Sequence, residues 1–136
     1  MKTIVLGVDD SAESARAVER TIELARMSGA SVIVTSVAPV MQFMARGTGP
    51  YDPTDPPERH RELAAEAAAR LTEQGIAART ITGLGDAGAI IVELAGEHDA
   101  DLVVVGMSSH PHVARFLGGV SEDVAHHAGC DVLLVH

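Results

Sequence analysis

The sequence predicts an α/β fold: a doubly wound parallel sheet of five strands with helices on both faces. Two observations support this. Aliphatic runs without polar alternation, such as Thr3–Val8 and Leu102–Val105, are typical of strands that are buried on both faces. These runs alternate with longer segments of helical periodicity, as in a chain built from βαβ units. A length of 136 residues fits one domain, so we expect a single domain over residues 1–136.

The strand Thr3–Val8 is expected to lead directly into the first helix. Ser11 or Asp10 is a good N-cap for this helix, which runs to about Ser28. Its expected buried face is Ala15, Val18, Ile22 and Ala25. Gly29 follows as the residue that stops the helix, because glycine readily adopts the left-handed conformation of a C-terminal cap.

The middle of the chain is expected to contribute two strands and one helix. The second strand is Ser31–Val37, and the stretch Pro39–Pro57 is rich in proline and glycine and predicts a long loop. An alanine-rich helix follows over Glu58–Gln74. The third strand, Ala77–Thr82, is the weakest of the five because it carries polar residues.

The last third of the chain repeats the strand–helix pattern. A helix opens at Gly85-Asp86 and runs to about His98, and the fourth strand is Leu102–Val105. A helix over Val120–His127 then precedes the fifth strand, Val132–Val135. Strand orders 3-2-1-4-5 and 2-1-3-4-5 both fit this chain. We favour 3-2-1-4-5, because the first and fourth strands are the most apolar and belong in the centre.

In that arrangement the strand order reverses between strands one and four. Ligands bind such sheets at this point, outside the carboxyl ends of the strands. The walls of the crevice would be Val8–Ser11 and Gly106–Ser109. Asp9 there is either a polar contact to a base or ribose or a strand-end carboxylate. Capping of the helix is the favoured role of Asp10 and Ser11.

Composition excludes several classes of function. The net charge of −9 argues against nucleic acid and anionic membranes as partners, since both require a basic surface. Aromatic residues are only 2% of the chain, so a platform for stacking bases is not supported. Cys130 is the single cysteine and is expected to be a small core residue, which fits a reducing, cytoplasmic setting. No apolar stretch reaches the length of a membrane span.

Glycines near the last helix predict a phosphate site. Gly106 ends a strand, and the N–H groups of Gly119, Val120 and Ser121 lie at the following helix start, where anions bind. The Ser121 hydroxyl would be a further donor, and His110, His112 or Arg115 in the intervening segment would contact the anion. The alternative is ordinary helix-start chemistry without a ligand.

Other readings of these motifs fail. A phospho-receiver domain needs a lysine that ends the fifth strand, but Lys2 is the only lysine in the chain. Neither the P-loop motif nor the G-x-G-x-x-G motif is present. His110 and His112 flank a proline, and no further histidine or cysteine has ligand spacing nearby, so a dedicated transition-metal site is not predicted.

Taken together, these motifs resemble the universal stress protein family. The resemblance rests on VDDS after the first strand, GDAGAIIVELAGEHDADLVVVG before the loop, and FLGGVSEDVAHHAGCDVLLV at the end. It covers essentially the whole chain. It implies an adenine nucleotide α-hydrolase-like fold with strand order 3-2-1-4-5, and a homodimer in which the fifth strands pair. Val132–Val135 would be an apolar edge strand, which independently favours such pairing.

One branch of this family binds ATP through a G-x-x-G, nine-residue, G-[S/T] motif. The resemblance matches Gly106 to the first glycine and Gly118 to the third. It also matches Ser121 to a hydroxyl that contacts phosphate, Asp9 to an acidic residue near the adenine, and Val37 to a backbone contact with the base.

The chain departs from that motif at three places. Ser109 replaces the second glycine and adds a Cβ where the backbone approaches phosphate. Gly119 replaces the Ser or Thr, which removes a hydroxyl but keeps the N–H. The segment His110–Leu117 has eight residues instead of nine. The residues predicted to contact the nucleotide are Asp9, Asp10, Ser11, Val37, Gly106, Ser108, Ser109, Arg115, Gly118, Gly119, Val120 and Ser121.

The leading hypothesis is a cytoplasmic, homodimeric stress-response regulator with a degenerate pocket for ATP, with or without Mg²⁺. Hydrolysis would be slow, because no general base or lysine is evident near the phosphates. The alternative is a nucleotide-independent protein-interaction module from the branch of the family that does not bind ATP. A phosphate-processing enzyme that uses Asp9, His110 and Ser121 ranks third.

Overall fold

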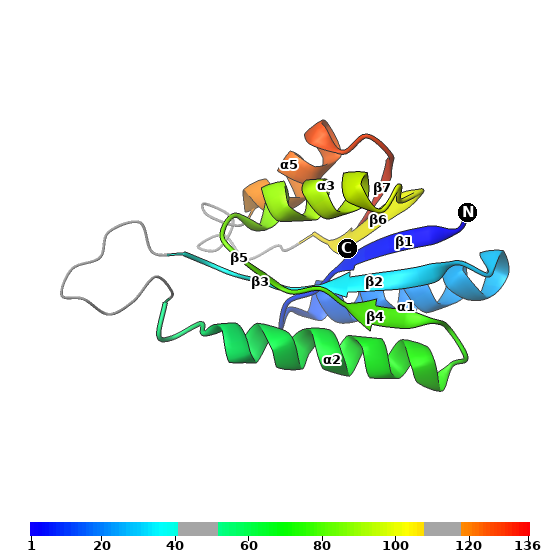
Figure 1. Cartoon of the computed structure of the whole chain (residues 1–136), viewed down its shortest axis with the longest axis horizontal. Helices are drawn as coiled ribbons and strands as arrows, with labels where there is room; N and C mark the ends of the chain where they lie inside the picture. The colour runs from blue at the N-terminus through cyan, green and yellow to red at the C-terminus, as the bar shows by residue number, and fades with distance from the viewer. Residues whose placement is uncertain (41–51, 108–117) are drawn as a thin grey trace.

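The structure, a computed structural model, describes residues 1–40, 52–107 and 118–136. Its centre is a five-stranded sheet in the order β4-β2-β1-β6-β7 (Figure 1). Every neighbouring pair is parallel. The strands are β1 (Thr3–Gly7), β2 (Ser31–Thr35), β4 (Ala78–Thr80), β6 (Leu102–Gly106) and β7 (Asp131–Val135). The predicted order 3-2-1-4-5 is therefore confirmed, and the two most apolar strands, β1 and β6, lie in the middle.

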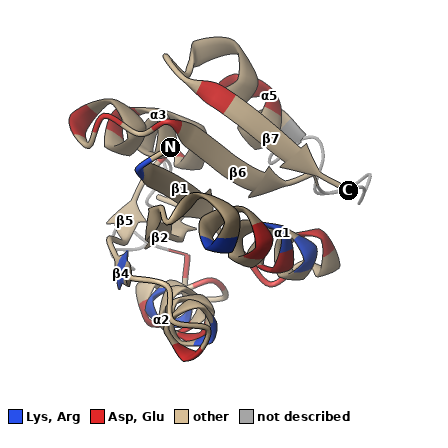
Figure 2. Cartoon of the chain, turned by 90° about the vertical axis from the view of Figure 1, so that its right-hand side faces the viewer, with Lys and Arg blue, Asp and Glu red and all other residues tan. Residues whose placement is uncertain are grey.

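Helices cover both faces of the sheet, as the unbroken apolar strands predicted. On one face lie α1 (Ala12–Ser28) and α2 (Pro57–Glu73), and on the other lie α3 (Ala87–Glu97) and α5 (Gly118–His127). Figure 2 shows these two layers on opposite sides of the sheet, with charged residues mainly on the helices and at strand ends. The strands thus have no face left for polar side chains, which is why they are almost wholly aliphatic.

Alternate residues of each strand enter two separate hydrophobic cores. Ile4 and Leu6 of β1 face α1 and α2, whereas Val5 between them faces α3 and α5. The fully buried aliphatic side chains of the two cores are Ile4, Val5, Leu6, Val32, Val34, Leu71, Val103, Val104 and Val124. An aliphatic core of this kind is what the near absence of aromatic residues requires.

The predicted second and third strands are each shorter than expected. The expected strand Ser31–Val37 is interrupted at Ser36, and its last part becomes β3 (Val37–Ala38). The expected strand Ala77–Thr82 is β4 alone, and a separate β5 (Gly83–Leu84) pairs with β3 in a two-stranded parallel sheet. At the interruption, the Ser36 hydroxyl donates to the Val8 carbonyl oxygen and also lies within hydrogen-bond distance of His60 of α2.

Local capping chemistry sets the ends of α1 and α3. The Ser11 hydroxyl accepts from the Ser14 N–H at 3.0 Å and caps α1, and Gly29 ends it in the left-handed conformation. Asp86 caps α3 by accepting from the Ala89 N–H. The predicted inward position of Ala15 is wrong, because that residue is exposed and the neighbouring position Ala17 is fully buried. The other predicted inward residues of α1 are confirmed.

The boundaries of the remaining helices differ slightly from the prediction. Helix α5 starts two residues before the predicted Val120, and α2 starts at Pro57, a residue suited to the first turn because its missing N–H has no helical partner. Cys130 is half-buried against the second core, and this burial raises the pKa of its thiol. A thiol of raised pKa is a poor nucleophile, consistent with the packing role predicted for it.

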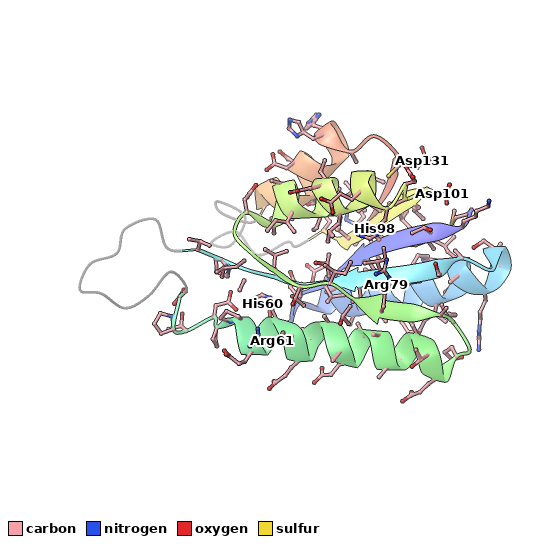
Figure 3. All side chains as sticks on the ribbon, viewed as in Figure 1. His60, Arg61, Arg79, His98, Asp101 and Asp131 are labelled. Carbon is pink, nitrogen blue, oxygen red and sulfur yellow. The ribbon has the colours of Figure 1, made fainter. Side chains whose placement is uncertain are left out.

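Asp101 fastens the start of β6 to the start of β1. Its Oδ2 accepts from the backbone N–H groups of Lys2 and Thr3 at 2.7 and 3.0 Å. These two bonds hold the pKa of the Asp101 carboxyl below its usual range, so the ionised form is favoured. Figure 3 shows Asp101 at the amino-terminal ends of the strands, far from their carboxyl ends.

Candidate functional site

The carboxyl ends of β1, β2 and β6 meet at one edge of the sheet, at the left of Figure 1. The register aligns Gly7 of β1 with Thr35 of β2 and with Val105 of β6. Because the strands are parallel, the residues that follow each of them emerge side by side. This is the point at which the strand order reverses, and it is where ligands of doubly wound sheets bind.

The residues after β1 are held by a compact set of hydrogen bonds. The Asp9 carboxylate accepts from the Ser11 N–H at 2.8 Å, and the Asp9 N–H donates to the Ser14 hydroxyl at 3.0 Å. The predicted capping role is therefore correct for Ser11, whereas Asp10 is not a cap and forms an ion pair with Arg59 of α2. Asp9 itself is exposed, so its carboxylate is fixed in orientation and still open to a ligand.

Gly106 is in close contact with α1. A Cβ on Gly106 would lie 2.7 Å from the backbone carbon of Glu13 and from the backbone nitrogen of Ser14. Backbone atoms in a helix cannot yield by several tenths of an ångström without moving the helix. The glycine pattern predicted close approach of a ligand here, and the structure shows that the close neighbour of Gly106 is the first turn of α1.

The start of α5 supplies the other side of the predicted phosphate site. Gly119 and Val120 are half-buried there, and Ser121 is only 4% exposed. Apart from its own helix and chain neighbours, no atom of the described residues lies within 4 Å of a Cβ placed on Gly119. The predicted contacts Ser108, Ser109 and Arg115, with His110 and His112, lie outside the described residues.

A buried chain of polar side chains next to this edge was missed by the sequence analysis. His60 of α2 is 7% exposed, and its Nδ1 lies 2.6 Å from the Ser36 hydroxyl. Its Nε2 lies 2.6 Å from a carboxylate oxygen of Asp55, the residue two positions before α2. The Ser36 hydroxyl in turn donates to the Val8 carbonyl at 2.8 Å. Figure 3 shows His60 between α2 and β3.

The sequence did hold a signal for this histidine. His60 precedes Ala64, Ala67 and Leu71 at intervals of four, three and four, so it continues the apolar stripe of α2. All four side chains are buried. A histidine on the buried stripe of a helix must find hydrogen-bond partners inside the protein, because an unpaired buried polar group is costly. The partners could not be identified before the fold was known.

A separate cavity of about 290 Å³ lies at the opposite, amino-terminal end of the sheet, between β2, β4 and the end of α3. Arg79 of β4 donates to the Nδ1 of His98, the residue that caps α3, at 3.2 Å. A cation at this place is explained by the partial negative charge at the carboxyl end of a helix. Figure 3 shows both side chains well away from the carboxyl edge of the strands.

The described residues contain neither a group of metal ligands nor a helix that could span a membrane. Within residues 1–40, 52–107 and 118–136, no three histidine, cysteine, aspartate or glutamate side chains are grouped so that they could hold a metal ion. In the same part of the chain, no helix combines the length and apolar character that crossing a membrane demands.

Comparison with known proteins identifies the family. A sequence profile of the universal stress protein family matches residues 1–136. The chain belongs to this family. It is 33% identical to the universal stress protein Rv1636 of Mycobacterium tuberculosis, over 99% of this chain and 96% of that protein. It is 31% identical to a putative universal stress protein of Staphylococcus saprophyticus, over 98% of this chain and 83% of that protein.

Solved structures of universal stress proteins have the same fold as this family member. One, a universal stress protein in complex with cAMP, is 30% identical with a TM-score of 0.72 and covers 99% of this chain and 97% of its own. Another, from Archaeoglobus fulgidus in complex with dAMP, has a TM-score of 0.76 at 24% identity, over 100% of this chain and 98% of its own. The predicted adenine nucleotide α-hydrolase-like fold is thereby confirmed.

Proposed function

We propose that this universal stress protein is a regulator that binds an adenine nucleotide, ATP in our prediction, at the carboxyl edge of β1 and β6. The main support is the likeness, at 30% identity over almost the whole chain, to a universal stress protein in complex with cAMP. A likeness of this extent supports a nucleotide pocket at the equivalent place on this chain. The residues of this chain must then fit the nucleotide.

The described residues fit such a ligand on two sides. Asp9 is exposed at the end of β1, where its carboxylate can accept from a ribose hydroxyl or a base amino group. Val37 follows β2 at the same edge and is half-buried, so its backbone is the expected contact for the base. Gly119 and Val120 lie at the start of α5, where free N–H groups and the helix dipole favour phosphate.

We further propose that the protein does little chemistry on the nucleotide. Lys2 is the only lysine in the chain and lies at the amino end of β1, opposite the proposed site. A Mg²⁺ ion would neutralise phosphate charge if it is bound with ATP. The residues of this chain would bind and orient the nucleotide, and hydrolysis would be slow. Regulation would then act through the bound state, in a cytoplasmic setting that suits the single cysteine.

We propose that the working unit is a homodimer that pairs through β7. This strand is the edge of the five-stranded sheet, and Val132, Leu133 and Leu134 on it are only half-buried. An apolar edge strand exposes unpaired backbone groups, which pairing with a second copy would satisfy. Sedimentation equilibrium should give twice the chain mass of 14.1 kDa, and a mass of one chain would rule the dimer out.

A nucleotide-independent interaction module is the second candidate. The Asp9 carboxylate is already engaged with the Ser11 N–H, and Ser109 and Gly119 depart from the ATP motif. Such a module would act by binding a protein partner through its surface. The following titration distinguishes the two candidates.

Isothermal titration of the purified protein with ATP and Mg²⁺ should give saturable binding, and Gly118→Val should weaken it at least tenfold. The physical reason is that a branched side chain at the start of α5 fills the space that the phosphates need. Thermal melting by circular dichroism would show that the variant is folded. No saturation of the unmodified protein at millimolar ATP would favour the interaction module instead.

A further inference from the structure

The hydrogen-bond partners of the buried Asp55–His60–Ser36 chain limit where its hydrogen atoms can lie. The Ser36 hydroxyl has one hydrogen, and it donates this hydrogen to the Val8 carbonyl at 2.8 Å. Its oxygen must then accept from His60 Nδ1, which lies 2.6 Å away. An ionised Asp55 only accepts, so His60 Nε2 at 2.6 Å must also carry a hydrogen. In this arrangement, with Ser36 donating to Val8, both ring nitrogens donate and the ring is an imidazolium paired with Asp55.

A neutral His60 ring requires a different arrangement. Nε2 keeps its hydrogen and donates it to the Asp55 carboxylate. Nδ1 is therefore the nitrogen that gives up its proton to solvent. A deprotonated Nδ1 is an acceptor. Among the described residues, its hydrogen-bond partner is the Ser36 hydroxyl, whose oxygen lies 2.6 Å away. The hydroxyl must turn toward the ring, and the Val8 carbonyl loses this donor. Ser36 cannot serve both acceptors, because it has one hydrogen.

We propose that His60 is a proton-operated latch on the carboxyl edge of the sheet. With the proton bound, it ties Asp55 and α2 to Ser36 and, through the Ser36 hydroxyl, to the carbonyl of Val8, the residue that follows β1. With the proton lost, the tie between Ser36 and Val8 opens. Imidazole side chains as a class change charge between about pH 5 and 8, and this sets the pH range over which the latch is tested.

The charged groups around His60 leave Asp55 as its main electrostatic partner. On α2 itself, Arg59 is paired with Asp10 and Arg61 with Glu58. Strands β2 and β3 contribute no charged side chain. On β4, Arg79 bonds to His98 on the opposite face of the sheet. The groups that α1 presents to α2 are Glu19, in an ion pair with Arg70, and Arg26, bonded to Gln74.

The latch links proton binding to the predicted ligand edge. Val8 immediately precedes Asp9, and Ser36 immediately precedes Val37, so both ends of the Ser36–Val8 bond adjoin a predicted nucleotide contact. Asp9 is anchored to α1 through Ser14. The junction of β1 with β2 is held by the Ser36 hydroxyl together with the Val8 N–H, which donates to the Thr35 carbonyl at 2.9 Å. Opening the latch would therefore remove one of the two ties of the β1–β2 junction and leave the β1–α1 bond in place.

The test is a pH titration of the full-length, nucleotide-free protein by NMR between pH 5 and 9. We expect the His60 ring nitrogens to change from two protonated sites to one, with hydrogen retained on Nε2. The carbonyl carbon of Val8 should shift with the same midpoint. In Ser36→Ala, His60 should still titrate while the Val8 signal no longer follows it. In Asp55→Asn, the shared midpoint should move to lower pH.

His98→Gln is the matched control, because it removes a histidine that lies outside the latch and should leave the Val8 titration unchanged. A Val8 carbonyl signal that does not share the midpoint of His60 would overturn the proposal. So would a His60 ring that keeps one protonation state across the whole range. Neither readout uses a nucleotide, so a protein that failed to bind ATP could still have the latch, and the two proposals can fail separately.

Discussion

Replacing Gly106 with alanine should lower the free energy of unfolding by about 3 kcal/mol, which is the upper part of the usual range for overpacking a core. The added Cβ would lie 2.7 Å from backbone atoms of Glu13 and Ser14, and no real Cβ tolerates that distance. Helix α1 would have to move away from the end of β6. Chemical denaturation followed by circular dichroism measures the loss.

The matched control is the same change at Gly119, the glycine that stands at the Ser or Thr position of the motif. A Cβ there would meet nothing within 4 Å, and the residue lies in the first turn of α5. Alanine is the better helix former, so Gly119→Ala should leave stability unchanged or raise it by up to about 1 kcal/mol. Equal losses of stability in the two variants would contradict the packing argument for Gly106.

Replacing His60 with alanine should lower the free energy of unfolding by about 2 to 3 kcal/mol, from a lost charged hydrogen bond and the void left in a buried site. The ring is 7% exposed and makes two hydrogen bonds of 2.6 Å that hold α2 and Asp55 to the sheet. Denaturant unfolding at neutral pH provides the measurement.

His98→Ala is the control for this loss. His98 is half-buried at the end of α3, and within the described residues the side-chain partner of its ring is the exposed Arg79. Removing such a surface contact should change stability by no more than about 0.5 kcal/mol. If both histidine variants lost stability to the same extent, the buried chain at His60 would not be an important tie between α2 and the sheet.

The motif alone assigned the role of Gly106 incompletely and assigned no role to His60. Gly106 matches the first glycine of the ATP motif, yet its lack of a side chain is required by α1 whether or not a nucleotide binds. A variant at Gly106 that lost binding would therefore say little about phosphate contact. Gly118 and Gly119 at the start of α5 are the better positions for testing the proposed site.

Most of the fold could be predicted because local patterns and burial agree. The apolar runs in β1 and β6 predicted central strands, and the caps Ser11 and Gly29 set the ends of α1. The prediction failed at the ends of β2 and β4. Ser36 separates β2 from β3 within an apolar β-branched run. Its contacts with Val8 and His60 join segments that are remote in the chain, so the local pattern does not reveal them.

The candidate site could be predicted only in outline. The strand ends placed Asp9 and Gly106 at one edge of the sheet, and the family resemblance added Val37. The register confirms that β1, β2 and β6 end side by side. Motif spacing could not show that Asp10 pairs with Arg59, which is 49 residues away. It also could not show that His60 reaches Ser36, because that contact joins two elements separated by the segment before α2.

The sequence by itself determined the α/β class, the strand order and the family, because these depend on the periodicity of apolar residues and on motifs that are contiguous in the chain. Only the tertiary structure decided which glycine is needed for packing and which histidine is buried. Those properties depend on distances between segments that are remote in the chain. A Cβ at Gly106 is forbidden by a helix nearly a hundred residues earlier, and His60 is held by groups from two other segments.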